Sequence, residues 1–567
     1  MAMSIDDIKA TAKKITSSNE RTHYNSIITL LNEFEYDQAS FQDNELVEQK
    51  LRFLVVALFQ IFKKMFARND LSMSTKRPGA NNNTATVPLA KFNEWCRKIY
   101  ISFKMKLLAT IGNLTIETSL ALDCLDLYMQ LLELESVHFA SKKDAAFFPN
   151  KTLKALIVAL WKSNINENEI DPSNGQSANY ILLEFLEKYY KPFVDIQYYF
   201  QSEFNLLLED KDSSTSTTEQ YTSMKSAAKW VTLMNHDSHM DSTTEELEVF
   251  VSNPPQAIEN ESKFKSLLEK NWCAILNGEL SLQLYKTILT VLHKRIIPHF
   301  HTPTKLMDFL TDSYNLSNDD MDQNGIIPIL ALNGLFELMV KNNLEYPNFY
   351  QKLYQLLTPQ LMHVKYRPRF FRLMDVFLAS THVSVHLVAS FIKRLARLSL
   401  SAPPSAIVIV IPFIYNLLKK HPNCMIMIHN PKYLYDPFQT PEQQNELKLA
   451  KSQYEDPFNM EEQDPESTNA FGSSLWEMDT LTQHYHPNVA SLAKVFSQPF
   501  KKMNYNMEDF LDWGYDSLLA AESSRKLKIL PVLEYETFDS ILANETIDQK
   551  EEEDTPDKSV YLSSVSW

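Results

Sequence analysis

Glycine is scarce in this sequence, and its scarcity excludes several classes of enzyme. The 567 residues include only 8 glycines, against about 40 at the usual frequency of ~7%. No two of them stand closer than nine positions apart. A P-loop and a dinucleotide-binding fingerprint both need clustered glycines to bring backbone N–H groups against phosphate, and a nucleophile elbow needs GxSxG. β-Hairpins also rely on glycine in their turns, so we expect a mainly α-helical chain.

Cysteines and long apolar runs are few as well. Cys96, Cys124, Cys273 and Cys424 stand at least 28 positions apart, which excludes a CxxC redox pair and a compact cysteine-based zinc site. We expect them to be reduced, mostly buried thiols. No apolar run approaches the ~20 residues that cross a bilayer, and the first residues lack the apolar core of a signal peptide. The sequence therefore predicts an intracellular protein without a membrane segment.

The charge of the chain is unevenly distributed. The formal net charge is −16, and residues 531–567 contain ten acidic residues and two lysines, so half of the excess lies in this tail. Such a composition predicts an acidic tail that is disordered on its own and docks onto a basic partner surface. A second acidic segment lies near residues 437–470 and is expected to be a solvated loop.

The apolar spacing predicts two helical regions. We expect an N-terminal α-helical region over 1–210, a Ser/Thr-rich linker over 211–242 and a C-terminal α-helical domain over 243–530. Amphipathic helices of about 12 to 20 residues with short connections are typical of HEAT or armadillo repeats. The predicted fold is an all-α, HEAT/armadillo-like superhelix with disordered loops. An irregular α-bundle remains an alternative, because no clean sequence repeat is found.

Six basic residues make a candidate RNA-binding face. Three of them lie on one side of a helical pattern whose other side is apolar, and the other three form a basic cluster just upstream. Clustered cations can neutralise phosphate. The alternative is that they pair with nearby carboxylates and contribute to solubility. The six RNA-contact candidates are Arg367, Arg369, Arg372, Lys393, Arg394 and Arg397.

Catalytic and metal-binding signals are weak. The closest histidine groupings, His236 with His239, His299 with His301, and His484 with His486, lack the HExxH form that places two ligands and a base on one helix. We predict no metal, no cofactor and no enzymatic activity. A hydrolase whose residues meet only in the fold is a low-ranking alternative.

A series of motifs carries a family resemblance over about residues 325–525. It begins with Arg394-Leu-Ala-Arg-Leu-Ser-Leu-Ser-Ala-Pro-Pro and Ile411-Pro-Phe-Ile-Tyr-Asn-Leu-Leu-Lys-Lys-His-Pro, and continues with Asp456-Pro-Phe, Ser474-Leu-Trp-Glu-Met, His484-Tyr-His-Pro and Glu508-Asp-Phe-Leu-Asp. These motifs resemble the C-terminal domain of the CCAAT-binding-factor-like family of nucleolar ribosome-assembly proteins, and the chain length resembles that of the small-subunit member. The sequence departs from the family directly after the last motif. Family members often have a polar residue after Phe-Leu-Asp, whereas this chain has Trp513-Gly514-Tyr515.

The resemblance implies a function as well as a fold. It implies a HEAT-like scaffold in the small-subunit processome of the nucleolus, where it acts in pre-rRNA processing and in the assembly and export of the small ribosomal subunit. It further implies a stable heterodimer with the large nucleolar protein fourteen and contacts with other processome proteins and with pre-rRNA. We expect no binding to DNA, because the sequence has no zinc-finger or basic-zipper pattern, and none to membranes, because no apolar run is long enough to cross one. The partner-binding candidates on its motifs are Tyr415, His421, Trp476, His484, Tyr485 and His486.

Overall fold

The computed structural model describes most of the chain, in segments. They are residues 4–17, 21–34, 45–71, 86–112, 117–140, 145–163, 170–209, 221, 223–236, 248–316, 325–343, 345–433, 438 and 440–526. Within these segments the regular structure is helical, and the only β-type contact is an isolated bridge between Ile170 and Ser177. The predicted acidic tail, residues 531–567, and residues 211–220, 222 and 237–242 of the predicted linker lie outside the described residues.

The N-terminal helices pack in an order that follows the chain. Helix α4 lies against α1 and α6, α5 lies against α6 and α7, and α7 lies against α9. The bounds are α1 Ile5–Ser17, α2 Asn25–Glu33, α4 Glu45–Ala67, α5 Thr86–Gly112, α6 Ser119–His138, α7 Asn150–Lys162, α8 Tyr180–Phe185, α9 Val194–Glu209 and α11 Met224–Met234.

The C-terminal helices continue the same arrangement. Helix α12 packs on α9, α15 packs on α13, α14 and α17, and α18 packs on α19. The bounds are α12 Glu261–Leu276, α13 Leu282–Val291, α14 Met307–Asn315, α15 Ile326–Asn342, α16 Phe349–Gln355, α17 Arg367–Phe377, α18 Val385–Ser399, α19 Pro404–Lys420, α20 Pro441–Ser452, α21 Trp476–Thr480, α22 Pro487–Ala493, α23 Glu508–Leu511 and α24 Tyr515–Ser523.

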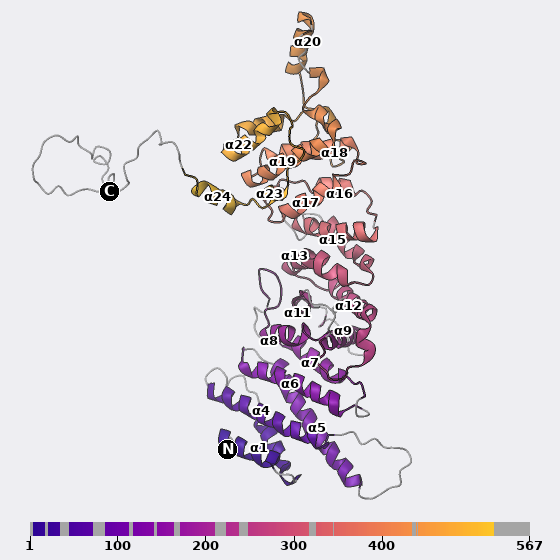
Figure 1. Ribbon diagram of the computed structural model, residues 1–567, viewed down its shortest axis with the longest axis vertical. Coiled ribbons are helices and arrows are strands. Elements are labelled where there is room, and N and C mark those ends of the chain that lie inside the picture. The colour runs from indigo at the N-terminus through magenta and orange to yellow at the C-terminus, as the bar shows by residue number, and fades with distance from the viewer. Residues whose placement is uncertain are drawn as a thin grey trace, which may run out of the picture.

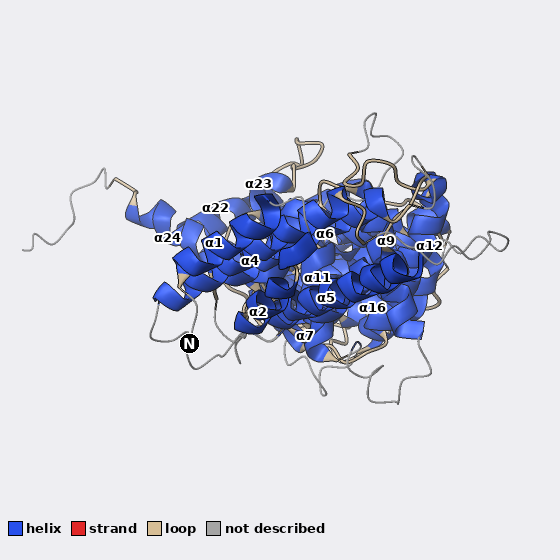
Figure 2. Ribbon diagram, turned by 90° about the horizontal axis from the view of Figure 1, so that it is seen from below, coloured by secondary structure: helices blue, strands red, loops and turns tan. Residues whose placement is uncertain are grey.

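The helices form one elongated column. Figure 1 shows α1 at one end, the helices from α18 to α24 at the other, and α20 projecting beyond the column. Seen from below in Figure 2, the helices overlap one another along the column axis. A continuous apolar core runs from Ile8 to Leu511. The prediction of an all-α repeat superhelix is confirmed.

The predicted linker over 211–242 is wrong where the structure describes it. Helix α11 occupies Met224–Met234, and its residues from Ser226 to Met234 are all buried. The Trp230 ring stacks on Phe204 of α9 at 4.6 Å and meets Trp272 of α12 edge-on at 6.0 Å. Because aromatic side chains bury large areas, α11 joins the two predicted regions into one core.

Lysine and arginine side chains cap the C-terminal ends of several helices. The last carbonyls of a helix have no partner within it, and glycine, the residue that most often completes a helix end, is rare here. In five cases among the described residues, a cation on a later element donates to those carbonyls or to the turn just after them, where the helix dipole also favours positive charge. The donors are Lys106 for α2, Lys229 for α7, Arg295 for α11, Arg369 for α13 and Arg394 for α16.

The cysteines are as predicted. Cys96, Cys124 and Cys424 are buried, Cys273 is partly buried, and all four are free thiols. Burial raises the pKa of Cys96 to about 12 and that of Cys424 to about 11, so both are protonated at neutral pH. None of the described helices combines the length and the apolar character that a membrane crossing requires.

Candidate partner-binding surface

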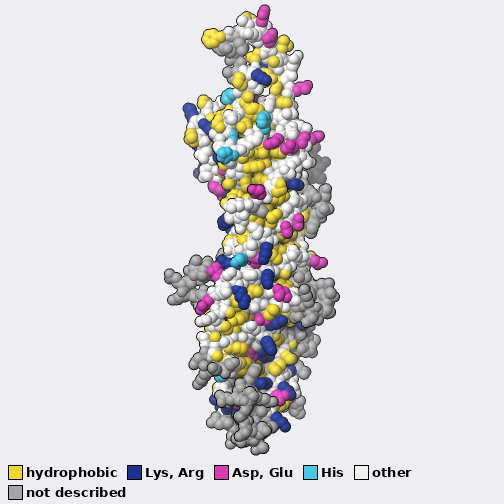
Figure 3. All heavy atoms as spheres, turned by 90° about the vertical axis from the view of Figure 1, so that its right-hand side faces the viewer, with side chains coloured by type: hydrophobic (Ala, Val, Ile, Leu, Met, Phe, Trp, Pro, Cys, Tyr) yellow, Lys and Arg dark blue, Asp and Glu magenta, His cyan; other side chains and the backbone are white. Residues whose placement is uncertain are grey.

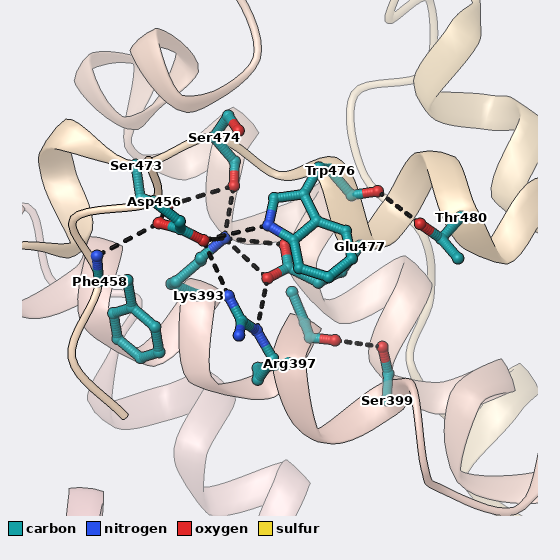
Figure 4. A network of polar contacts seen from close by, with 11 residues as sticks. Lys393, Arg397, Ser399, Asp456, Phe458, Ser473, Ser474, Trp476, Glu477 and Thr480 are labelled. Atoms are coloured by element: carbon teal, nitrogen blue, oxygen red, sulfur yellow. Dashed lines mark hydrogen bonds and ion pairs between the residues drawn. The ribbon is translucent and has the colours of Figure 1, made fainter. Parts of the chain in front are cut away.

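The basic side of α18 is turned into the protein. Lys393 is fully buried, with its Nζ 2.7 Å from Glu477 Oε1, 2.9 Å from Asp456 Oδ2 and 2.6 Å from the Ser474 carbonyl. Arg397, one turn later, donates to the same two carboxylates at 2.8 and 2.9 Å. Figure 4 shows the two cations and the two carboxylates converging between α18 and the segment that leads into α21.

Trp476 completes this network from its outer side. Its indole N–H donates to Asp456 Oδ2 at 3.0 Å, and the Arg397 guanidinium lies 4.9 Å from the ring centroid. Cations are attracted to the face of an indole ring. The ring therefore shields the ion pairs from water, although 40% of the residue remains exposed.

The acidic segment near residues 437–470 is only partly the solvated loop that its composition predicts. Residues 441–452 form the exposed helix α20, and Asp456 belongs to the buried network. Burial alone raises the pKa of Asp456, but hydrogen bonds from Ser473, Lys393 and Trp476, together with the Lys393 charge, outweigh it and lower the pKa to about 2. The carboxylate is ionised wherever the protein is folded at ordinary pH.

The other predicted RNA contacts are also used within the protein. Arg367 is buried and donates to the carbonyls of Met362 and Trp513. Arg372 makes a two-point ion pair with Glu508, with hydrogen bonds of 2.8 and 2.6 Å. The remaining two, Arg369 and Arg394, are helix-capping donors.

The predicted phosphate-binding face is therefore wrong as a single surface. Lys393 and Arg367 are inaccessible, and the other four cations have carboxylate or carbonyl partners that lie far away in the sequence. On the face shown in Figure 3, lysine and arginine side chains are most frequent over the N-terminal half of the column, away from these helices. The alternative, that the cations pair within the protein, describes the structure.

Two partner-binding candidates are also internal. Tyr415 is buried and donates its hydroxyl to the Lys502 carbonyl at 2.8 Å. His421 is buried at the end of α19, where Nε2 donates to the Leu378 carbonyl at 2.7 Å. Both side chains are fully used in packing, so their assignment to a partner surface is wrong.

Tyr415 instead helps to hold a strap, residues 500–505, along α19. Asn416 donates to the Tyr505 carbonyl at 2.8 Å and accepts from the Tyr505 N–H at 2.7 Å. Lys419 donates to the Phe500 carbonyl at 2.8 Å. Because these contacts are made to backbone groups, α19 fixes the path of the strap, which leads directly to α23 and α24.

The loop 484–486 exposes Tyr485, whereas His484 and His486 are partly buried. Tyr485 is 80% exposed, and its ring lies 4.3 Å from that of His484. His486 Nε2 lies 4.0 Å from Glu522 on the last turn of α24. Leu519 is three residues before Glu522, and residues three apart share a helix face. Leu519 is 69% exposed.

Tyr515 extends this surface by one further turn. It stands four residues before Leu519, is 52% exposed, and its hydroxyl lies 3.2 Å from His363 Nδ1. We call Tyr485, Tyr515 and Leu519, flanked by His484 and His486, the Tyr485 surface. The sequence predicted the loop residues. Tyr515 and Leu519 were missed, although their spacing after Gly514 is a signal of one helical face.

No acid–base or metal centre is found among the described residues. Groups of three or more His, Cys, Asp or Glu side chains that could hold a metal ion are absent from that part of the chain. The pKa of His484 is lowered by burial and by the nearby His486, which favours a neutral ring on the surface at pH 7.

The column and its C-terminal end define an all-α repeat protein. Two family models match the chain: one described as nucleolar complex protein 4-like, TPR repeats, over residues 4–213, and one described as the CBF/Mak21 family, over residues 328–493. The N-terminal description names TPR repeats, whereas the sequence pattern was compared with HEAT and armadillo repeats. Both belong to the stacked helical architecture.

Relatives cover the whole chain. Nucleolar complex protein 4 of Saccharomyces cerevisiae is 60% identical over 568 residues, covering 100% of both chains. An uncharacterized protein of Schizosaccharomyces pombe is 35% identical over 83% of this chain and 87% of its own length, and nucleolar complex protein 4 homolog A of Xenopus laevis is 44% identical over 49% and 48%. The chain belongs to the nucleolar complex protein 4 family. It is a nucleolar protein with a role in ribosome biogenesis.

Proposed function

We propose that this chain is a non-enzymatic scaffold of the small-subunit processome that binds a large nucleolar partner protein. The resemblance of its C-terminal motifs points to nucleolar protein fourteen, in a stable heterodimer, and to pre-rRNA processing and assembly and export of the small subunit. The proposal rests on one observation: the aromatic and apolar side chains of Tyr485, Tyr515 and Leu519 are exposed at the C-terminal end of the column.

The support is built before the partner arrives. Side chains of α19 hold the strap, which leads into α23 and α24, by hydrogen bonds to its backbone groups. The buried ion-pair network fixes α21 just before the loop. A preformed surface loses little conformational entropy on binding. Tyrosine is enriched at binding hot spots because it buries a large area with few rotatable bonds.

The test is co-purification of the partner with surface variants. Tyr485→Ala together with Leu519→Ala removes exposed side chains and leaves the core intact. We expect loss of the partner from the tagged full-length chain in moderate salt, with and without RNase. A matched control is Val340→Ala, which removes an exposed apolar side chain, 61% accessible, on α15. Full retention of the partner by the Tyr485/Leu519 variant contradicts the assigned surface.

RNase treatment separates this proposal from RNA-mediated recruitment. A partner that stays bound after RNase at constant stoichiometry supports direct protein contact. If RNase releases the partner, RNA holds the complex together, and the scaffold role at this surface is wrong.

A further inference from the structure

The segment that connects α21 to α23 differs from the rest of the chain in its charge. The sequence carries 71 aspartates and glutamates among 567 residues, yet residues 480–507 contain none of them and three lysines, Lys494, Lys501 and Lys502. Helix α19, against which α22 and α23 pack, has no acidic residue either. Carboxylates resume on either side of the segment, at Asp479 and at Glu508, and Glu508 is paired with Arg372.

Two aromatic side chains anchor the strap and leave the residues between them turned outward. The rings of Phe500 and Tyr505 lie 4.5 and 4.9 Å from the ring of Tyr415 on α19. Hydrogen bonds from α19 to the strap backbone fix the same two ends. The four residues between the anchors, 501–504, are all exposed. The strap therefore displays two lysines from a fixed backbone, which loses little conformational entropy on binding.

The three lysines of the segment keep their charge available. Lys494, Lys501 and Lys502 are exposed, and none of them makes an ion pair with another described residue, unlike the buried Lys393. The Lys502 Nζ lies 4.4 Å from the centroid of the Tyr505 ring. A contact of this kind orients the ammonium group without neutralising its charge.

Lys494 lies close to the start of the strap. It stands two residues before Phe496, whose ring lies 5.9 Å from the ring of Phe500. Ser497 and Gln498, which follow Phe496, are exposed. Lysines and uncharged polar side chains are the groups that proteins use to contact the phosphates and sugars of nucleic acids. A surface of this composition without carboxylates suits a polyanion.

We propose that Lys494, Lys501 and Lys502 bind the phosphate backbone of RNA. A protein is the less suitable ligand, because the centre of a protein interface is apolar and aromatic. Among residues 494–505, all of which the structure describes, Met503 is the one large apolar side chain that is exposed. Phosphate contacts carry no sequence information, so the binding is not sequence-specific. The inference rests on the proposed role in pre-rRNA processing for the identity of the RNA, whereas the phosphate contact itself does not.

The salt dependence of RNA binding tests this inference. The probe is a fluorescent oligouridylate of about 20 nucleotides, and its affinity for the full-length chain is measured by anisotropy. Three phosphate contacts add about −2 to the log–log slope on a single strand, which corresponds to a further loss of about twentyfold between about 50 and about 200 mM salt. Lys494→Gln with Lys501→Gln and Lys502→Gln should bind at least tenfold more weakly at the lower salt and lose this part of the slope.

A second triple variant controls for the net charge of the chain. Lys432→Gln with Lys448→Gln and Lys451→Gln removes the same charge from exposed lysines in or near α20, which Figure 1 places at the same end of the column. It should keep the affinity and the slope of the unmodified chain. Equal losses in both triple variants overturn the proposal, as does a strap variant that binds the oligonucleotide like the unmodified chain.

Photo-cross-linking locates the contact on the chain. An oligouridylate that contains 4-thiouridine should become attached within residues 494–505, as found by mass spectrometry of the digested chain. Attachment exclusively to other parts of the chain overturns the assignment of this surface.

Partner co-purification after RNase separates this inference from the proposed function. The strap variant should retain the protein partner, whereas Tyr485→Ala with Leu519→Ala should lose it and still bind the oligonucleotide normally. If that variant retains its partner, the proposed partner surface is wrong, and the salt slope still decides the RNA contact. If the strap variant loses the protein partner and binds RNA with unchanged affinity, the surface serves a protein and the RNA assignment is overturned.

Discussion

Lys393 Nζ lies 2.7 Å from Glu477 Oε1, and both side chains are fully buried. They come from α18 and α21, 84 positions apart in the sequence, and they fix the segment that carries the CBF/Mak21 motif residues against the helical column. A buried charge without a partner is costly, whereas a buried pair with additional hydrogen bonds is tolerated. Arg397, Asp456 and the Ser474 carbonyl supply those bonds here.

Lys393→Met should destabilise the C-terminal end strongly, because it leaves Glu477 buried with only Arg397 as its cation. Breaking such a pair from one side typically costs about 3–5 kcal/mol. Chemical denaturation, followed by the intrinsic fluorescence of the tryptophans, measures the loss. Lys494→Met removes an exposed lysine and should stay within about 0.5 kcal/mol.

The double variant Lys393→Met with Glu477→Leu separates the pair from its packing. Replacing both partners by apolar groups of similar volume is often neutral, so the double variant should recover most of the loss. A double variant that is as unstable as the sum of the two single variants shows that the two charges do not interact.

Asp456 should make the stability of this region depend on acid pH. Burial raises its pKa, but the hydrogen bonds from Ser473, Lys393 and Trp476 dominate and lower it to about 2, below the unperturbed 3.8. A depressed carboxyl pKa stabilises the fold above the unfolded pKa, and the contribution disappears as the pH falls from about 5 toward 2. With allowance for solvent screening, we expect about 1 kcal/mol from this group.

The measurement is the urea midpoint between pH 6 and pH 2.5, compared with that of Asp456→Asn. The unmodified chain should lose more stability on acidification than the variant, by the amount that Asp456 contributes. Equal slopes for both proteins contradict a role for the Asp456 charge. Glu461→Gln, an exposed change in the same loop, is the control.

The sequence predicts the helices and the repeat architecture because apolar spacing is a local signal. It does not predict which basic residues are internal. Arg397 pairs with Asp456, which is 59 positions away in the sequence. Because the composition of α18 contains no sign of this partner, it suggests a basic outer face. The prediction of a linker over 211–242 is wrong for a related reason. The polar residues on both sides of α11 hide its apolar pattern in the sequence, and the burial of α11 depends on α9 and α12.

The sequence also does not distinguish exposed from buried residues among the partner-binding candidates. His484, Tyr485 and His486 are recognisable as aromatic residues on a proline-bounded loop. Tyr415 and His421 carry the same chemistry in the same family motifs, yet both are buried. Exposure separates the two groups, and it depends on contacts made far away in the sequence: Tyr415 is covered by the strap, and His421 bonds to the Leu378 carbonyl after α17.

Lys229→Met should destabilise the column near its middle. The Lys229 Nζ donates to the carbonyls of Leu160, Trp161 and Ser163 at the end of α7. The substitution removes these hydrogen bonds and leaves the buried carbonyls without their donor. Each buried unsatisfied group costs about 1–3 kcal/mol. Hydrogen exchange should therefore quicken at the end of α7 and in α11. Lys162→Met, which removes an exposed cation at the same helix end, should leave the exchange rates unchanged.

Gly175→Ala should lower the stability of the fold more than most substitutions of a small residue. Gly175 has a φ of +70°, and an added Cβ would stand 2.5 Å from the Leu284 nitrogen at the start of α13. The left-handed backbone costs about 1–2 kcal/mol for an L-residue, and the clash with fixed backbone adds about 1–3 kcal/mol. We expect a loss of thermal stability of several degrees, measured by calorimetry. Gly514→Ala is the matched control, because its φ is −111° and its Cβ would meet open space. An equal loss in both variants would show that the loss of glycine in general, not the close approach of Gly175 to α13, determines the cost.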